Sequence, residues 1–416
     1  MSINSALLAG VSGLVANSSA LAAISDNIAN VNTVAYKRNQ VNFANVVTAQ
    51  AVTGKYSAGG VQGITRQFVS TQGLIQSSGS ATDLAISGDG FFIVSDKGTG
   101  LTAADPRSFT RQGSFSVDAN GFLKNDSGLY LQGWPVQTGG TFVTPPSDLT
   151  ALAPINVKNL GAAVSPTANV AVSANIDKVS ATAPSPVDIN IVDAAGGRHT
   201  LRLAFAQTAV NAWTMTATTQ PTPADATITP ASPIAVTFNT DGTINTVGGV
   251  APTAFALNLA WAAPLGLPAQ AINVDLSKLT QFDEPSSVGS ISQDGAGAGN
   301  VVAIEVDEDG IVSAIYDNSQ TRKVAKIGIA TFPNADGLAK TSGNAYRSTI
   351  DAGELVIKQA GLGGAGRISP SSLEASTVDL SAEFTGLIQT QKAYSASSKI
   401  ITTADQMLEE LINIKR

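Results

Sequence analysis

The chain has 416 residues, of which 43% are hydrophobic and only 13% are charged, and its formal net charge is −7. This length is typical of two to four domains, and the negative charge argues against nucleic acid as the main partner. Because there are no cysteines, disulfides, thiolate chemistry and cysteine-based zinc sites are excluded.

The N-terminal stretch, residues 1–32, is predicted to be a helix. Gly10 and Gly13 each cost a helix interior about 1 kcal/mol relative to alanine, so we expect this helix to be marginal in isolation. No basic residue precedes Lys37, which argues against a cleaved signal peptide, and no segment is expected to span a membrane. The apolar side chains that recur on one face of this helix are Leu7, Leu14, Leu21, Ile24, Ile28 and Val31.

Short β-strands are predicted after a linker over residues 33–70. Asn120-Gly121, which lies between two apolar stretches, is a strong hairpin signal. A related pattern around Asp309-Gly310 returns later in the chain. The two hairpins predict one inner β domain, made of residues 71–144 and 285–358 and interrupted by an insertion.

The insertion, residues 145–284, holds 13 of the 18 prolines and almost no helical periodicity. We predict a separate outer β-rich domain with turns marked by proline and a further hairpin at Asp241-Gly242. Trp213 and Trp261 could stack on a sugar, but large aromatic side chains more often belong to a core.

The C-terminal helix is predicted to begin near Ser376 or Thr377, after a linker over residues 359–375. Ser376 to Asp379 fits the capping-box pattern, and the helical stretch 376–416 pairs with 1–32 in a terminal helical domain. The positions that step alternately by four and three residues are Leu380, Phe384, Leu387, Gln391, Tyr394, Ser398, Ile401, Asp405, Leu408 and Ile412.

Neither terminal stripe can be buried by its own helix, so each needs a partner helix from the other terminus or from another copy of the chain. The polar positions Gln391, Ser398 and Asp405 have two interpretations. They mark an imperfect surface helix, or they weaken the contact between the paired helices or fix its register. The predicted fold class is α+β, mainly β, with paired coiled-coil terminal helices and two nested β-rich domains.

Three motifs resemble sites but fail on their context. His199 is the only histidine, so one chain cannot build a histidine-dependent triad or a two-histidine metal site. Residues 361–366 match G-x-G-x-x-G, but Pro370 follows where a nucleotide-binding fold needs a helix. The acidic run ending at Gly310 has Tyr316 where a calcium loop needs glutamate. We therefore expect no catalytic residue, cofactor or metal, and no enzyme.

Both ends and part of the middle resemble the bacterial flagellar rod and hook protein family. The matching segments are Ser5–Asn39, Asp83–Phe92, Phe109–Gly113, Val378–Thr385 and Gln391–Leu408. Ala35 stands where the family usually has glycine, and Ser376-Thr377 replaces the more usual Ser-Asn. The N-terminal signature residues are Asn27, Ile28, Ala29, Asn30, Thr33, Tyr36 and Lys37.

The resemblance implies a structural, self-assembling subunit of the bacterial flagellum and its basal body. The size of the insertion favours the hook, a flexible curved tube that acts as a universal joint and transmits torque from rod to filament. The alternatives are a distal rod protein, or a secreted β-rich adhesin or carbohydrate-binding protein.

The implied partners are other copies of the chain, the distal rod protein, the hook cap, the hook-filament junction proteins and the flagellar type III export apparatus. Nucleic acid binding and membrane insertion are not expected. The resemblance also implies an extracellular location in the flagellum, with export that needs no cleaved signal peptide.

Overall fold

The computed structural model describes residues 3–46, 59–137, 139–158, 160–179, 184–220, 225–253 and 255–414. Residues 47–58 of the predicted first linker lie outside these ranges. The chain forms two compact units, each described separately below. The terminal unit comprises Met1–Asn159, Ile304–Ser313 and Lys323–Arg416, and the insert unit comprises Leu160–Ala303 and Ala314–Arg322.

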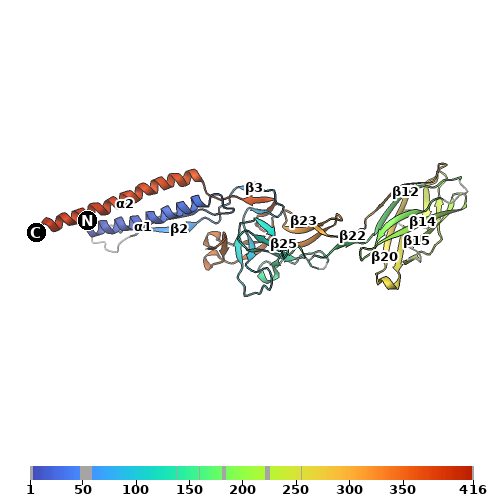
Figure 1. The fold of residues 1–416 in the computed structure, drawn as a ribbon, viewed down its shortest axis with the longest axis horizontal. Coiled ribbons are helices and arrows are strands. Elements are labelled where there is room, and N and C mark those ends of the chain that lie inside the picture. Colours follow the sequence, from blue (N-terminus) through green and yellow to red (C-terminus); the bar gives the residue numbers. More distant parts are fainter. Residues whose placement is uncertain are drawn as a thin grey trace. The chain divides into compact units, whose positions relative to one another are not determined.

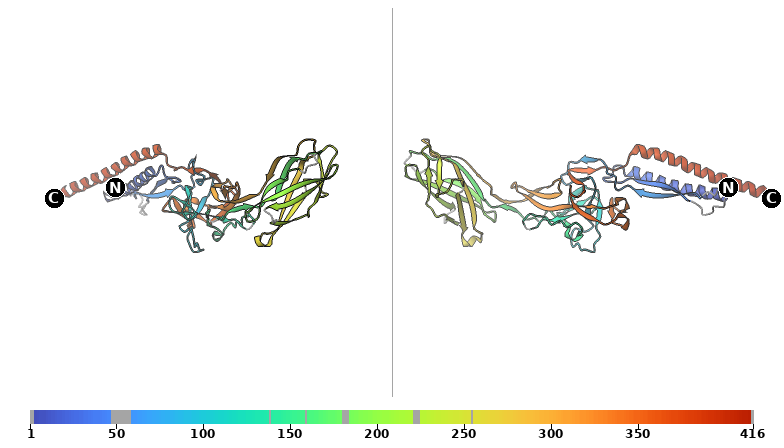
Figure 2. Two further views of the ribbon diagram at one scale, coloured as in Figure 1. Left: turned by 45° about the vertical axis from the view of Figure 1, so that its right-hand side comes forward. Right: turned by 180° about the vertical axis from the view of Figure 1, so that it is seen from behind.

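The terminal unit contains both long helices, which lie side by side in every view (Figures 1 and 2). Its elements are α1 (Ile3–Ala29), β1 (Asn39–Asn45), β2 (Val61–Gln67), β3 (Ile75–Ser77), β4 (Leu84–Ser87), β5 (Phe91–Ser95), β6 (Ser108–Thr110), β7 (Phe115–Val117), β8 (Leu123–Asn125), β9 (Tyr130–Pro135), η1 (Leu149–Ala151), β10 (Ala153–Pro154), η3 (Ala335–Gly337), β26 (Ala339–Thr341), β27 (Ala345–Arg347), η4 (Ile350–Ala352), β28 (Val356–Gln359), β29 (Arg367–Pro370), β30 (Ser372–Glu374) and α2 (Leu380–Ile414).

Three strands run across the sequence positions at which the units divide, namely β23 (Val301–Val306), β24 (Ile311–Tyr316) and β25 (Thr321–Thr331). In the main sheet of the terminal unit the strand order is β23-β24-β25-β9-β5-β6-β27-β26. Its core gathers aromatic side chains from distant strands, including Phe91, Phe109, Trp134 and Tyr346.

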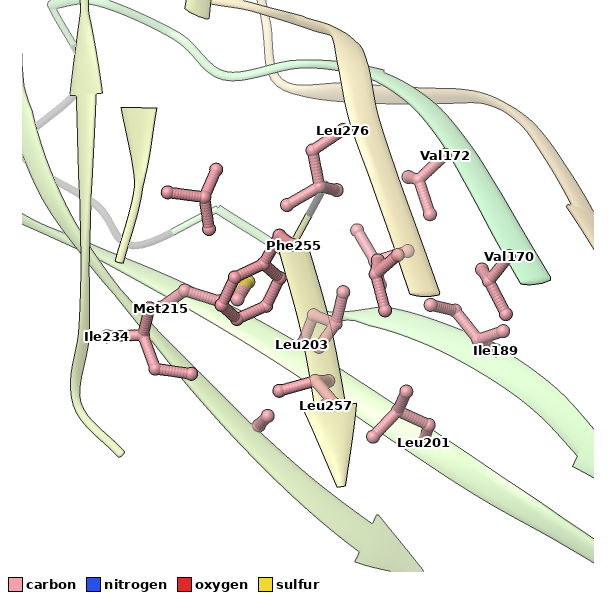
Figure 3. Close-up of a cluster of buried hydrophobic side chains, with 14 of the residues drawn as sticks. Val170, Val172, Ile189, Leu201, Leu203, Met215, Ile234, Phe255, Leu257 and Leu276 are labelled. Atoms are coloured by element: carbon pink, nitrogen blue, oxygen red, sulfur yellow. The ribbon is translucent and has the colours of Figure 1, made fainter. Parts of the chain in front are cut away.

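The insert unit is a sandwich of two five-stranded sheets, ordered β16-β19-β20-β12-β21 and β13-β14-β15-β17-β18. Side chains from both sheets meet in one apolar core, where Val170 and Phe255 of the first lie with Leu203 and Met215 of the second (Figure 3). The elements are β11 (Ala163–Ser165), β12 (Asn169–Asn175), β13 (Val187–Val192), β14 (Arg198–Ala209), β15 (Ala212–Gln220), β16 (Ala226–Thr229), β17 (Ile234–Phe238), β18 (Ile244–Val247), β19 (Phe255–Trp261), η2 (Ala263–Leu265), β20 (Gln270–Thr280), β21 (Ser287–Gln293) and β22 (Ala296–Gly299).

The three predicted hairpins are confirmed, and each turn contains a glycine with positive φ. β7 pairs with β8 around Asn120-Gly121, β17 pairs with β18 around Asp241-Gly242, and β23 neighbours β24. Gly121 and Gly310 have φ of 89° and 79°, a region that favours glycine. The carboxylates of Asp118 and Asp307 each accept a backbone N–H four residues on, at 2.8 Å.

The boundaries of the insert unit differ from the predicted 145–284, because its main segment is Leu160–Ala303 and a second segment, Ala314–Arg322, also belongs to it. At the front, Ala153 and Pro154 pair with β9, which holds this stretch in the terminal unit. At the back, β21 pairs with β12 and extends a sheet of the insert unit beyond residue 284. Proline content marks the domain, but strand pairing sets its edges.

α2 begins at Leu380, later than the predicted start at Ser376 or Thr377. Thr377 is used elsewhere, because its backbone N–H donates to Tyr36 O and its hydroxyl accepts from the Arg38 N–H. The cap is Asp379, whose carboxylate accepts from the N–H groups of Ser381 and Ala382 at 2.8 and 3.1 Å.

Candidate assembly site

The two terminal helices pair antiparallel in one consistent register. Gly10 lies so close to Ile401 that a Cβ built on the glycine would be 3.0 Å from Cγ1 of the isoleucine. A Cβ on Gly13 would be 3.1 Å from the Ser397 hydroxyl, and one on Gly386 would be 3.5 Å from Ile24. The glycines that weaken α1 in isolation therefore allow the helices to approach closely.

A second face of α1 packs against the β1–β2 hairpin. Val61 N donates to the Ser12 hydroxyl at 3.1 Å, and Gly63 lies against Ala16. The side chains of α1 that are buried are therefore small or polar, not the leucines of the predicted stripe: Ala16, Ala20 and Asn27. The sequence could have indicated this buried face of α1 through the regular spacing of its small residues.

The third face of α1 is exposed and mostly apolar, with the charged Asp26 near its C-terminal end. It runs along Leu8, Val11, Val15, Ser18, Ala22, Ser25 and Ala29, all of which are exposed. The three large side chains at its start are 68%, 48% and 63% exposed, in the order given. This set is called the free stripe of α1 below.

The predicted stripe residues Leu7, Leu14, Leu21, Ile24 and Ile28 are all half-buried, and Ile24 lies on the face that contacts α2. Val31, also half-buried, lies in the turn after α1, because the helix ends at Ala29 and not near residue 32 as predicted. On α2 the predicted set divides in two. Leu387, Ser398, Ile401 and Leu408 are half-buried, whereas Leu380, Phe384, Gln391, Tyr394, Asp405 and Ile412 are exposed. A single helix partner thus covers only part of either stripe.

A shallow apolar groove of about 440 Å³ lies where the start of α1 meets the last turns of α2. Ala6 forms its α1 side, and Ile400, Ala404 and Met407 contribute from α2. Ile400 and Met407 are half-exposed, at 50% and 56%. This end of the helix pair therefore leaves further apolar surface in contact with water.

The expectation that no segment could span a membrane was too strict. Ala6–Ala29 is long and apolar enough to do so by length and composition alone. A helix that is buried in an assembly passes the same test, so this property by itself does not assign α1 to a membrane.

The signature residues build a tight turn after α1. The Asn27 side chain is fully buried, donates to Asn39 O at 2.8 Å and accepts from Asn39 N at 2.9 Å. Asn30 donates to Asp26 O and accepts from the Thr33 hydroxyl, which closes the turn. Ile28 is half-buried and Ala29 is exposed.

Tyr36 and Ala35 complete this turn. Burial, followed by the nearby Asp26 carboxylate, raises the pKa of Tyr36 to about 12, so its hydroxyl stays protonated and can donate to Asn27. Ala35 is buried with φ of 56°, in the left-handed region where a side chain is strained. The structure thus confirms that alanine occupies a position suited to glycine.

A buried ionic cluster ties the two ends of the chain to the β-sheet core. Glu374, just before α2, accepts from Lys37 Nζ at 2.5 Å, from Gly73 N at 2.8 Å and from Arg111 Nη1 at 3.3 Å. The side chains of Lys37 and Glu374 are fully buried and that of Arg111 is 3% exposed. We call these three residues the junction cluster.

In the junction cluster, burial and the charge of Glu374 have opposite effects on the pKa of Lys37. Burial lowers the pKa of Lys37 below its ordinary value, and the charge and hydrogen bond of Glu374 act against this effect. Lys37 also donates to Thr71 O at 2.5 Å, and Arg111 donates to Gly88 O at 2.8 Å. A second ion pair, Arg38 with the buried Glu383, holds the first turn of α2 to the chain after α1.

The tryptophans and the glycine-rich segment that were considered as possible binding sites belong to the core and to a loop. Trp213 and Trp261 are 2% and 8% exposed in the sandwich core, which leaves no open face for a sugar. Residues 361–366 form the connection between β28 and β29, and no helix follows at once. Among the described residues, no group of three or more His, Cys, Asp or Glu side chains could hold a metal ion.

Four family models match the chain, and together they cover most of it. They are "Flagella basal body rod protein" over residues 7–37, "Flagellar hook protein FlgE/F/G D1 domain" over 85–180, "Flagellar basal body protein FlaE D2 domain" over 159–296 and "Flagellar basal body rod FlgEFG protein C-terminal" over 369–414. The junction cluster draws one residue each from the first, second and fourth of these ranges, namely Lys37, Arg111 and Glu374.

Curated relatives match over the full length. The chain is 38% identical to flagellar hook protein FlgE of Caulobacter vibrioides and 32% identical to that of Rhizobium meliloti, with 100% of each chain covered in both comparisons. It is 30% identical to flagellar hook protein FlgE of Salmonella typhimurium over 92% of this chain and 93% of the relative. The crystal structure of Helicobacter pylori flagellar hook protein FlgE2 resembles 72% of this chain and all of that chain, with a TM-score of 0.44 and 13% identity.

Proposed function

The chain belongs to the flagellar hook protein family, and we propose that its two terminal helices form the assembly core of the subunit. Its function is that of a structural subunit of the flagellar hook. In our proposal each helix contacts the other helix of its own chain on one face and neighbouring copies on the other.

The observation that carries this proposal is the free stripe of α1. Leu8, Val11 and Val15 remain exposed although α2 and the β1–β2 hairpin already occupy the other faces. Burying one such side chain contributes about 1.5–3 kcal/mol, so leaving three in water is costly for a chain that acts alone. The exposed α2 residues Leu380, Phe384 and Ile412 supply a second surface of the same kind.

The division of the predicted stripe residues supports two kinds of helix contact. The half-buried positions, such as Leu387 and Ile401, suit a permanent coiled-coil-like pair within one chain. The exposed positions, such as Phe384 and Tyr394, suit contacts that form only on polymerisation. The exposed Gln391 and Asp405 then lie among intersubunit contacts, where polar groups weaken or align an interface.

In this proposal the junction cluster transmits torque between the helix pair and the β-sheet core of the terminal unit. A load on the helix pair reaches the β-sheet core through Glu374, which holds Lys37 from the N-terminal side and Arg111 from the sheet. We propose that this short ionic link keeps the helices and the core of the terminal unit turning together. The insert unit would then add outer contacts with neighbouring copies, because its surface is poor in charge.

Family membership supports a wider set of partners and a location. The distal rod protein, the hook cap, the hook-filament junction proteins and the flagellar export apparatus are the proposed partners. We also propose an extracellular position in the flagellum, reached by export without a cleaved signal peptide. A distal rod role is less well supported, since the full-length relatives described above are hook proteins.

The experiment is to place a charge on the free stripe. Val15→Asp should leave the monomer folded, because Val15 is 63% exposed, but should abolish tubes, because a buried unpaired carboxylate is costly. Circular dichroism reports the fold, and electron microscopy and swimming in soft agar report assembly. Gln406→Asp, at an exposed position of α2 on the side that also carries Lys399 and Glu410, is the matched control and should still form tubes. Normal tubes from Val15→Asp would show that the free stripe is not an assembly surface.

A further inference from the structure

The sulfur atoms of this chain all belong to methionine, because it has three methionines and no cysteine. Met215 is fully buried in the core of the insert unit, and Met1 lies outside the described residues. Met407, in the last turns of α2, is 56% exposed. The three tryptophans, which also react with oxidants, are at most 8% exposed. Within the described part of the chain, Met407 is therefore the sulfur that an oxidant in solution can reach.

Met407 lines the apolar groove at the end of the helix pair, together with Ala6 of α1. Ala404, one turn before Met407 and also part of the groove, is 6% exposed. The nearest polar side chain among the lining residues is Thr403, whose hydroxyl already donates to Lys399 O at 2.8 Å. The Lys399 side chain starts eight residues before Met407, about 12 Å away along the helix axis. The groove thus provides the Met407 sulfur with apolar neighbours and no free hydrogen-bond donor beside it.

Oxidation would change the chemistry of this surface. A peroxide transfers one oxygen atom to the thioether: the O–O bond breaks, an S–O bond forms, and the peroxide is reduced to water or an alcohol while the sulfur is oxidised to the sulfoxide. A flexible apolar side chain becomes a polar one with a strong acceptor oxygen. In the free subunit, water can donate to that oxygen. Covering the groove would remove this water and leave the acceptor unpaired, which is costly.

We propose that Met407 is an oxidation site that controls assembly: a subunit with the thioether can join a tube, and a subunit with the sulfoxide cannot. This inference rests on the proposed function, in which neighbouring copies cover the apolar surface of the helix pair. Once the groove is covered, the sulfur is also shielded from the oxidant. An oxidant should therefore stop free subunits from joining and leave existing tubes intact.

The test treats the full chain with hydrogen peroxide before polymerisation and follows the gain of one oxygen in the Met407 peptide by mass spectrometry. Complete oxidation should raise the critical concentration for tube formation at least about tenfold, the factor expected when the burial of one such side chain is lost. Met407→Leu keeps an apolar side chain of similar size together with Met1 and Met215, so it is the matched control. Its critical concentration should be the same before and after peroxide.

Reduction provides a second arm of the test. Methionine sulfoxide reductases with dithiothreitol return the sulfur to the thioether and release the oxygen as water, so they should restore the critical concentration of the native chain. Met407 in assembled tubes should oxidise several-fold more slowly than in free subunits. Equal oxidation rates, an unchanged critical concentration of the oxidised chain, or an equal loss of assembly in oxidised Met407→Leu would overturn the proposal.

These outcomes are distinct from a failure of the proposed function. Val15→Asp tests the free stripe of α1 without any oxidant. Loss of tubes in Val15→Asp, combined with normal assembly of the oxidised native chain, would refute the role of Met407 and leave the helix core in place.

Discussion

Glu374→Gln removes one charge from the junction cluster while keeping the shape of the side chain. In the native chain Glu374 is the carboxylate that both Lys37 and Arg111 contact, at 2.5 and 3.3 Å. The amide leaves both cations buried without a counter-charge and turns an N–H₂ group toward a donor. Breaking a buried ion pair by removing one partner costs about 3–5 kcal/mol, a large share of the 5–15 kcal/mol that stabilises a typical domain.

The pH dependence of this loss has a definite sign. Burial lowers the pKa of Lys37, and Glu374 opposes that shift, so Glu374→Gln should lower the pKa further. Between the lowered value and the ordinary pKa of about 10.4, the folded chain binds fewer protons than the unfolded chain, and the free energy of unfolding rises with pH. The deficit of Glu374→Gln should therefore shrink between pH 7 and pH 10.

The assay must report on the terminal unit alone, because a chain of two units need not unfold in one step. Trp134 is buried in the core of the terminal unit, and the other two tryptophans lie in the insert unit. Urea unfolding followed by ¹⁹F NMR of 5-fluorotryptophan-labelled chain separates the three signals. Glu308→Gln, which affects an exposed pair with Arg367 at 3.8 Å, is the control and should have almost no effect. A deficit below about 1 kcal/mol, or one that does not change with pH, would refute the role of the cluster.

Two further predictions concern the turn and the insert. Ala35→Val should lower the free energy of unfolding of the terminal unit, followed by the Trp134 signal, by about 2 kcal/mol, because a β-branched side chain at φ 56° adds strain. Ala35→Gly should change this free energy by less than about 1 kcal/mol. A valine variant as stable as the native chain would contradict this reasoning. Replacing residues 160–299 by a short Gly/Ser bridge should still give tubes, with altered curvature or a straight shape in electron micrographs, because the terminal helices drive assembly. If the folded deletion variant does not polymerise, the insert unit is a primary assembly element.

Local patterns in the sequence were sufficient for the elements that depend on local chemistry. The Asn120-Gly121 and Asp241-Gly242 turns need a flexible glycine and a nearby carboxylate, and both are visible as neighbours in the chain. The two helices follow from periodicity, although the start of α2 was predicted too early. That error arose because Thr377 bonds to Tyr36 and Arg38, residues far away in sequence.

The tertiary structure decided which faces of those elements matter. Periodicity identified an apolar stripe on α1, but the buried contacts are made by Gly10, Gly13 and Ala16, because close approach of backbones favours small side chains. The junction cluster could not be foreseen, since Lys37 and Glu374 are 337 positions apart and each alone is an ordinary charged residue. The sequence by itself determined the family, the helices and the turns, because their signals lie within a few residues of one another. Only the folded chain determined the ion partners, the small-residue contact and the free stripe, because burial and charge neutralisation depend on which distant segments meet.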